Sequence, residues 1–279
     1  MRPNIFHYTN YLDFLRDWLA HLKKSGEPRL SLRELARAAD LSPAAISIGI
    51  NGKQTLSEKT LEKILGKLQL NFEEIQFLRT LRRIVESPTD ALKLDALNEA
   101  IQHPQYQAQN KNNREVYDYL SNWVHVLVHE MSQLPDFDSD PKWIQNRSVH
   151  PIPKDEILRA VVFLEAANFL ERDENGNLRS THRNLKCDSG VFSISLHHFH
   201  RSMLQLAEKS IKISDQNTRN LQGLTIQVSD IQYAEINKII NESLNKIEAV
   251  CSERATQTEV YHMEFALFPL TRTSRTENT

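Results

Sequence analysis

Hydrophobic residues in the first third of the chain recur at three- and four-residue spacings, which predicts a series of short amphipathic helices. Residues 8–24 place their apolar side chains on one helical face, and the Ser-Gly-Glu-Pro sequence at 25–28 ends this helix. Residues 31–40 predict a second helix, in which Ser31 caps the first turn and Glu34 reaches back toward it.

Three more helices are predicted to complete the N-terminal domain. After a break at Asp40-Leu41, Ser42-Pro43 starts a third helix, because serine is a good N-cap and proline at the first helical position loses no hydrogen bond. This helix ends at Asn51-Gly52. Ser57 caps a fourth helix, and residues 72–85 predict a fifth.

The middle of the chain predicts a different arrangement. Residues 113–134 form one long amphipathic pattern, and a short helix at 141–147 and a helix opening at Pro153 follow. Two short strands are then expected on either side of a reversal at Asn175-Gly176. A helix followed directly by a two-stranded hairpin is typical of a winged helix.

The C-terminal part alternates between helical and strand-like patterns. A helix at 193–213 precedes a strand at 224–229, a long helix at 230–254 and a strand at 259–268. Two strands make a thin core, so we expect their sheet to be completed by other parts of the chain or by a second copy.

These patterns predict a mainly α protein with a small α+β part. The expected domains are a five-helix helix-turn-helix domain (1–86), a connector with a modest helix near 90–101 (87–112), a winged-helix-like domain (113–190) and a small αβαβ domain that dimerises (191–279).

Composition limits the possible functions. The chain has 279 residues, 40% hydrophobic and 25% charged, which is ordinary for globular domains. No apolar run approaches the roughly 20 residues that span a bilayer, so no membrane partner is expected. The N-terminus lacks the pattern of a secretion signal, and Cys187 and Cys251 lie far apart, which favours the cytoplasm.

The net charge of −2 means that any DNA contact depends on a local patch.

The spacing of the second and third predicted helices carries the functional hypothesis. They are separated by about three residues, as in a DNA-binding helix-turn-helix, where the first helix supports a second that enters the major groove, about 12 Å wide. Helix N-termini also suit backbone phosphates. Double-stranded DNA is therefore the expected partner. The candidate DNA contacts are Arg33, Ser42, Ala44, Ala45, Ser47, Lys53, Gln54 and Thr55.

Two resemblances support this hypothesis. LRELARAADLSPAAISIGINGKQTLSEKTLEKILGKLQL resembles the phage-repressor-like (Cro/repressor) helix-turn-helix superfamily over roughly residues 30–70. Over nearly the whole chain, YTNYLDFLRDWL, FLERDENGNLRST, HHFHRSMLQLA and ALFPLTR resemble an uncharacterised bacterial family that joins such a helix-turn-helix to a long C-terminal domain of unknown function. This resemblance implies a regulatory role.

The third helix departs from the usual pattern of base-reading helices. It offers no Arg, Lys, Asn or Gln, the side chains that make paired hydrogen bonds with bases. Ser47 and Gln54 stand where members of the family commonly have lysine and arginine. Two hypotheses stay open: a DNA-binding transcriptional regulator that acts as a homodimer, and a protein-interaction adaptor that keeps the scaffold without specific DNA readout.

The predicted hairpin supplies a second candidate surface. Arg179, His182 and Arg183 lie in a stretch without acidic residues, so a basic wing could contact phosphates or a minor groove. A contact between domains or between copies explains the same residues equally well.

Catalytic chemistry finds no support in the motifs. His125 and His129 are four residues apart, but HExxH is absent and no carboxylate or cysteine completes a zinc set. His197, His198 and His200 are expected to be packing or surface residues. Glycine-rich phosphate loops and GxSxG are absent. We therefore expect no enzyme activity, metal or cofactor, and no residue set identifies a small effector.

Overall fold

The computed structural model describes residues 2–25, 32–52, 56–181, 189–251 and 257–271. In these ranges the chain forms 13 α-helices and one two-stranded antiparallel sheet, which confirms the predicted mainly α fold with a small α+β part. The chain divides into two compact units. One comprises Met1–Asn122 and Asn184–Phe199, and the other Trp123–Arg183 and His200–Thr279.

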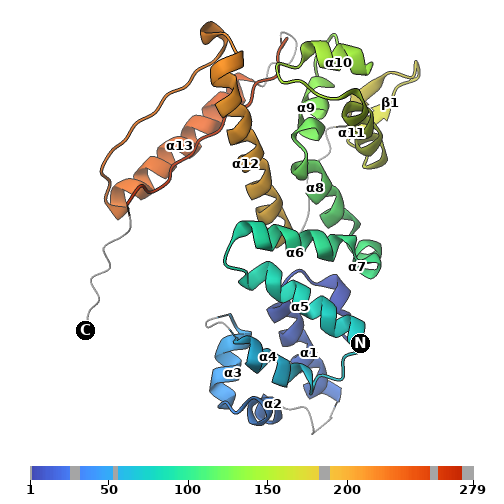
Figure 1. Cartoon of the computed structure of the whole chain (residues 1–279), viewed down its shortest axis with the longest axis vertical. Helices are drawn as coiled ribbons and strands as arrows, with labels where there is room; N and C mark the ends of the chain where they lie inside the picture. The colour runs from blue at the N-terminus through green and yellow to red at the C-terminus, as the bar shows by residue number, and fades with distance from the viewer. Residues whose placement is uncertain (1, 26–31, 53–55, 182–188, 252–256, 272–279) are drawn as a thin grey trace. The chain divides into compact units, whose positions relative to one another are not determined.

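Among its described residues, the regular elements of the first unit are all helices (Figure 1). Its elements are η1 (Ile5–His7), α1 (Tyr11–Ser25), α2 (Leu32–Ala39), α3 (Pro43–Ile50), α4 (Glu58–Leu65), α5 (Phe72–Glu86), α6 (Asp90–Gln102), α7 (Pro104–Gln109), α8 (Lys111–Ser121) and the start of α12 (Ser189–Ile213). The five predicted N-terminal helices correspond to α1–α5. Their caps at Ser42 and Ser57 are confirmed, because each hydroxyl accepts a backbone N–H in the first helical turn. Ser31 lies outside the described residues.

One hydrophobic core holds the first unit together. It buries residues from α1 to α7 and from the start of α12, including Tyr11, Ile46 and Leu78. Residues 87–112, predicted as a connector, contribute α6 and α7 to this core, and Tyr106 of α7 is fully buried. Its ring lies 5.7 Å from that of Phe77, measured between centroids.

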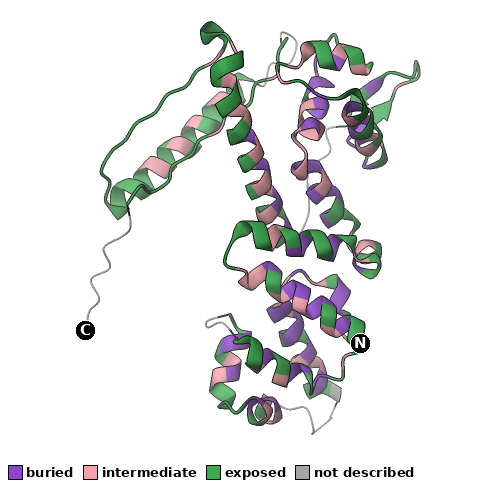
Figure 2. Ribbon diagram, viewed as in Figure 1, coloured by how far each residue is buried: buried purple, intermediate pink, exposed green. Residues whose placement is uncertain are grey.

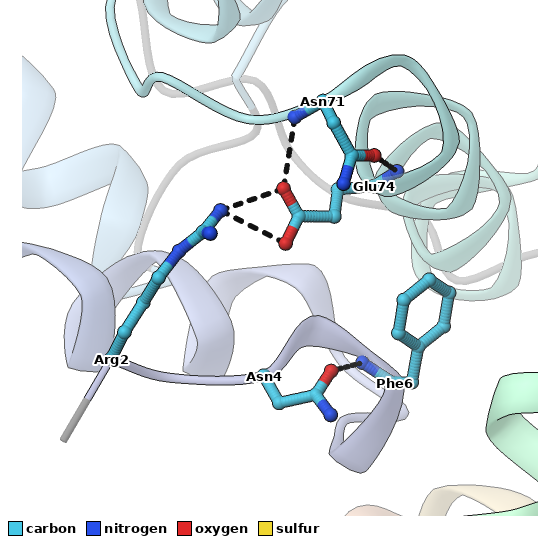
Figure 3. Close-up of polar contacts among 5 residues, drawn as sticks. All are labelled: Arg2, Asn4, Phe6, Asn71 and Glu74. Carbon is cyan, nitrogen blue, oxygen red and sulfur yellow. Dashed lines mark hydrogen bonds and ion pairs between the residues drawn. The ribbon is translucent and has the colours of Figure 1, made fainter.

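A carboxylate at the start of α5 anchors the N-terminal segment (Figure 3). Glu74 Oε2 accepts the backbone N–H of Asn71 at 2.9 Å, and Asn71 Oδ1 accepts the backbone N–H of Glu74 at 2.8 Å. This reciprocal pair is a capping box. The Arg2 guanidinium donates to both carboxylate oxygens at 2.9 and 2.7 Å. Glu74 therefore both starts a helix and holds the beginning of the chain on it.

The second unit combines helices with the small sheet (Figure 1). Its elements are α9 (Trp123–Met131), α10 (Pro141–Arg147), α11 (Lys154–Ala166), β1 (Leu170–Arg172), β2 (Leu178–Ser180), the rest of α12, η3 (Gln216–Thr218) and α13 (Asp230–Val250). The predicted hairpin is confirmed, with Leu170 opposite Ser180. Gly176 takes a φ of +83°, a left-handed conformation that glycine adopts without steric cost.

The single long helix predicted over 113–134 is wrong, because the chain breaks at Asn122. α8 ends at Ser121, and Asn122 is extended, with φ −129° and ψ 112°. The Ser121 hydroxyl donates to the carbonyl of Tyr117 at 2.7 Å and so competes for an acceptor of the last helical turn. A local side-chain hydrogen bond accompanies the break that the hydrophobic pattern does not show.

The strands predicted at 224–229 and 259–268 are also wrong for the single chain, and with them the αβαβ order of the last domain. Neither segment forms a strand, and β1 and β2 make up the whole sheet among the described residues. A strand needs a hydrogen-bonded neighbour, and these segments find none in the described part of the chain. The helix between them forms as expected, as α13.

We predict that Glu74→Ala lowers the free energy of unfolding by about 1–3 kcal/mol, because it removes half of the capping box and the partner of Arg2. The matched control is Glu73→Ala, in the same helical turn. The Glu73 side chain is 51% exposed, against 12% for Glu74. This control should cost about 0.5 kcal/mol, since exposed ion pairs contribute little. Urea denaturation measures both variants, and equal losses would contradict the anchoring role of Glu74.

Candidate nucleic-acid interface

Two short helices, α2 and α3, meet across a three-residue turn, Asp40-Leu41-Ser42 (Figure 1). Asp40 takes a left-handed conformation with φ +56°, and the N–H of Leu41 bonds to the carbonyl of Ala36 at 2.9 Å. Ser42 Oγ then accepts the N–H of Ala45 at 3.1 Å, which starts α3 with Pro43 at its first position. The predicted break and restart of the helix are confirmed residue by residue.

The inner face of α3 fixes the helix in place. Ile46, Gly49 and Ile50 are buried, and α3 packs against α1 and α2. On α2, Leu35, Ala36 and Ala39 are buried in the same core. Because one face of α3 is fully used for packing, the opposite face is held in a defined orientation.

The outer face of α3 is exposed within the first unit. Ser42, Pro43, Ala44 and Ile48 are exposed, and Ala45 and Ser47 are half-buried. Ile48 retains 42% of its surface. The face is therefore small and uncharged, which permits close approach to a flat or grooved surface but provides no bidentate reader of base edges.

The amide of Asn51, the C-cap of α3, is engaged at this face. Its Nδ2 donates to the carbonyl of Ser47 at 2.8 Å and lies 3.4 Å from Ser47 Oγ. Asn51 therefore serves to end the helix, and the Ser47 hydroxyl accepts from the same amide.

Charges surround this face rather than lie on it. Arg33 is exposed in the first turn of α2, and Lys59 is exposed on α4. Arg37 lies 3.2 Å from Glu34, so part of the positive charge is neutralised within α2. Residues 32–68 contain six Lys and Arg against four Asp and Glu, a local net charge of +2, whereas the whole chain carries −2.

The sequence did not predict an ion pair at the turn between α2 and α3. Lys63 Nζ of α4 lies 2.5 Å from Asp40 Oδ2, and this hydrogen bond lowers the pKa of the Asp40 carboxyl below its usual value. The two residues are 23 positions apart, and nothing in the local pattern of either signals the pairing. The pair places a negative charge at the turn and occupies a lysine that could otherwise face a phosphate.

The structure describes five of the eight predicted DNA contacts. Ser42, Ala44, Ala45 and Ser47 lie together on or beside the outer face of α3, and Arg33 lies on α2. Lys53, Gln54 and Thr55 lie outside the described residues.

Both described arginines of the hairpin pair with carboxylates, one on the hairpin and one on α11. Arg179 Nε lies 3.0 Å from Asp173 Oδ2, and this bond lowers the pKa of Asp173. Arg172 lies 2.8 Å from Glu165. His182 and Arg183, the other predicted wing contacts, lie outside the described residues. The described hairpin residues, 170–181, carry two arginines against three acidic side chains, a net charge of −1.

The histidines noted in the sequence take part in packing and polar contacts. His125 stacks on Phe163 with ring centroids 4.4 Å apart, and the buried His129 lies 3.1 Å from Ser180 Oγ. His197 lies 3.7 Å from Asp90. Across the described ranges, no three or more His, Cys, Asp or Glu side chains gather as a metal site. The helices in those ranges also include none with the length and apolar character to cross a membrane.

In comparison with protein families, residues 103–270 match the Domain of unknown function (DUF4423). Comparisons with curated proteins and with solved structures find no match. The matched region begins after α6, so α2 and α3 lie outside it. It covers more than half of the 279 residues, and the chain therefore belongs to the DUF4423 family.

Proposed function

We propose that this protein is a DNA-binding transcriptional regulator that acts as a homodimer and contacts double-stranded DNA through a helix-turn-helix formed by α2 and α3. The observation that carries the proposal is the division of α3 into two faces. Its inner face is buried, and its outer face, in a locally basic segment, is exposed within the unit.

The proposed contact is mainly electrostatic. The capped N-terminus of α3 presents backbone N–H groups to a phosphate, and Arg33 and Lys53 add side-chain cations. Ala44 and Ile48 can touch a thymine methyl, while Ser47 can donate to or accept from a base edge. Base readout would therefore depend on few hydrogen bonds, and sequence preference would come largely from apolar contacts and DNA shape.

The same face also supports a protein-interaction adaptor. Leu41 and Ile48 are exposed apolar side chains beside an uncharged helix, a combination typical of protein-binding surfaces. Such a surface binds a partner without a strong dependence on salt. The response of duplex binding to ionic strength therefore separates the two functions.

We predict that the full-length chain binds a fluorescent DNA duplex with an affinity that falls steeply between about 50 and 200 mM salt. Replacing Arg33 and Lys53 with alanine should reduce the slope of log K against log[salt] by about 2, or about 1 for each lost phosphate contact. Arg159→Ala is the control, because this arginine is exposed on α11 of the other unit. Absence of binding at low salt would favour the adaptor.

A second prediction uses the ion pair at the turn. Asp40→Asn should raise affinity for duplex DNA several-fold at low salt, because it removes a negative charge and releases Lys63 for a phosphate. Asparagine tolerates the left-handed conformation that position 40 requires, so the turn should survive. An Asp carboxyl is ionised near neutral pH, and the Lys63 hydrogen bond lowers its pKa further, so the pair is intact in the wild type under assay conditions.

The matched control for this gain is Asp155→Asn, which releases Arg159 from a comparable exposed pair, 2.6 Å long, on α11. Anisotropy titrations of both variants are compared at several salt concentrations. An equal gain from both variants would show that net charge, and not the α2–α3 turn, determines binding.

A further inference from the structure

The C-terminal part of the chain exposes apolar side chains on an unusual scale. Among the described residues from 204 to 270, none is buried, and α13 in Figure 2 is exposed or intermediate along its whole length. Fifteen large hydrophobic side chains are exposed between positions 221 and 270: Leu221, Leu224, Ile226, Val228, Ile231, Tyr233, Ile239, Leu244, Val250, Tyr261, Met263, Phe265, Leu267, Phe268 and Leu270.

The segment 259–268 carries one partly buried acidic side chain, Glu264, among exposed apolar ones. Glu264 contacts His200 of α12 at 2.9 Å and His262 at 3.1 Å, and its side chain is only 15% exposed. Its neighbours Met263 and Phe265 are 53% and 44% exposed. Because side chains alternate along an extended chain, Tyr261, Met263, Phe265 and Leu267 form the opposite, uncovered side.

The segment 224–229 shows the same alternation. Leu224, Ile226 and Val228 are exposed and alternate with Thr225, Gln227 and Ser229. Ser229 caps α13 through a capping box with Gln232, so the segment leads directly into the helix. Its period of two is that of a strand with one covered and one solvated face.

The helix between the two segments has a matching apolar stripe. Ile236, Ile240 and Ile247 lie at helical spacings and are half-buried, and the half-buried Ser243 lies on the same face with its hydroxyl bonded to the carbonyl of Ile239. Such spacing places them on one face of a helix and is typical of helices that pack against another element. Ile239 and Leu244 flank the stripe and are exposed.

A single chain leaves the apolar side chains of this unit exposed to solvent and its two strand-like segments without a paired strand. A two-stranded piece is at best marginally stable in water, and the backbone N–H and C=O groups of an unpaired strand favour pairing with another. Nine of the fifteen large side chains are more than half exposed, and together the fifteen present an apolar area on the order of 1,000 Å². A stable interface needs about 800 Å² per partner, so the uncovered surface is large enough for one.

We propose that a second copy of this chain covers the surface, with 224–229 and 259–268 pairing with the same segments of that copy to form one sheet that α13 covers. Two edges and one apolar helix face make the unit self-complementary, as a two-fold interface requires. The charges of α13 are mixed, with Lys238 and Lys246 among Asp230, Glu235, Glu242 and Glu248, so the helix lacks the basic excess that nucleic acid or an anionic membrane would select. This interface specifies how the homodimer of the proposed function forms, and it rests on the homodimer in that proposal.

Sedimentation velocity of the full-length chain without DNA tests the proposal. We expect the wild type to be a dimer at about 10 µM. Leu224→Glu with Ile226→Glu should raise the dimer dissociation constant at least about 100-fold. Thr225→Glu with Gln227→Glu is the matched control, because it adds the same charges to the polar side of the same segment and should leave the dimer intact. Circular dichroism checks that helix content is unchanged in both.

Met263→Glu with Phe265→Glu tests the other segment and should dissociate the dimer equally. Hydrogen exchange adds a readout of strand formation. The amides of 224–229 and 259–268 should be protected in the wild type and exchange fast in the dissociated variants. A monomeric wild type, equal dissociation by the control pair, or a dimer that survives both apolar-side variants would each overturn the proposal.

These outcomes are separate from those of the DNA proposal. A chain that dimerises as described but binds no duplex at low salt would retain this inference and lose the regulatory function. Conversely, the dissociated variants keep the first unit intact and should still bind duplex DNA weakly as monomers, if the regulatory function holds.

Discussion

Burial of one face of α3 is the interaction on which the candidate site depends. Ile46 and Ile50 insert into the core of the first unit beside α1 and α2, and this packing fixes both the position of the helix and the side it presents outward. An eight-residue helix is too short to be stable alone. Without that inner contact, the turn at Asp40 and the cap at Ser42 would have no persistent helix to join. Packing of the inner face in the core therefore determines which face of α3 is exposed.

The elements of the first unit were largely predictable because their signals are local. Ser42, Ser57 and Asn71 each bond to a backbone N–H within their own first turn, so the helix starts follow from a few adjacent residues. The hairpin likewise follows from Asn175-Gly176 and the short strands beside it. Capping and turn chemistry operate over three or four residues, the range that a sequence pattern reports well.

Some features that the sequence did not predict depend on contacts between residues far apart in the chain. Others depend on which hydrogen bond a single side chain forms. The pair between Asp40 and Lys63 joins two helices, and the anchoring of Arg2 on Glu74 spans 72 positions. The break at Asn122 coincides with a single serine hydroxyl that turns back on its helix. The strand-like segments at 224–229 and 259–268 have the right period, but strand formation requires a neighbour that the hydrophobic pattern does not identify.

Dimerisation would address two features of the chain at once: the weak DNA contact proposed for one copy, and the exposed apolar surface of the C-terminal part. A helix without Arg, Lys, Asn or Gln supplies few base contacts, and a local charge of +2 supplies modest phosphate attraction, so one copy alone would bind duplex DNA weakly. Joining two copies makes the second contact intramolecular and multiplies the affinity without any new residue at the groove. The apolar surface around α13 would provide the interface between the two copies. The proposed helix-turn-helix, which is weakly basic, and the proposed dimer are thus consistent in one chain, because dimerisation would compensate for the weak DNA contact of a single copy.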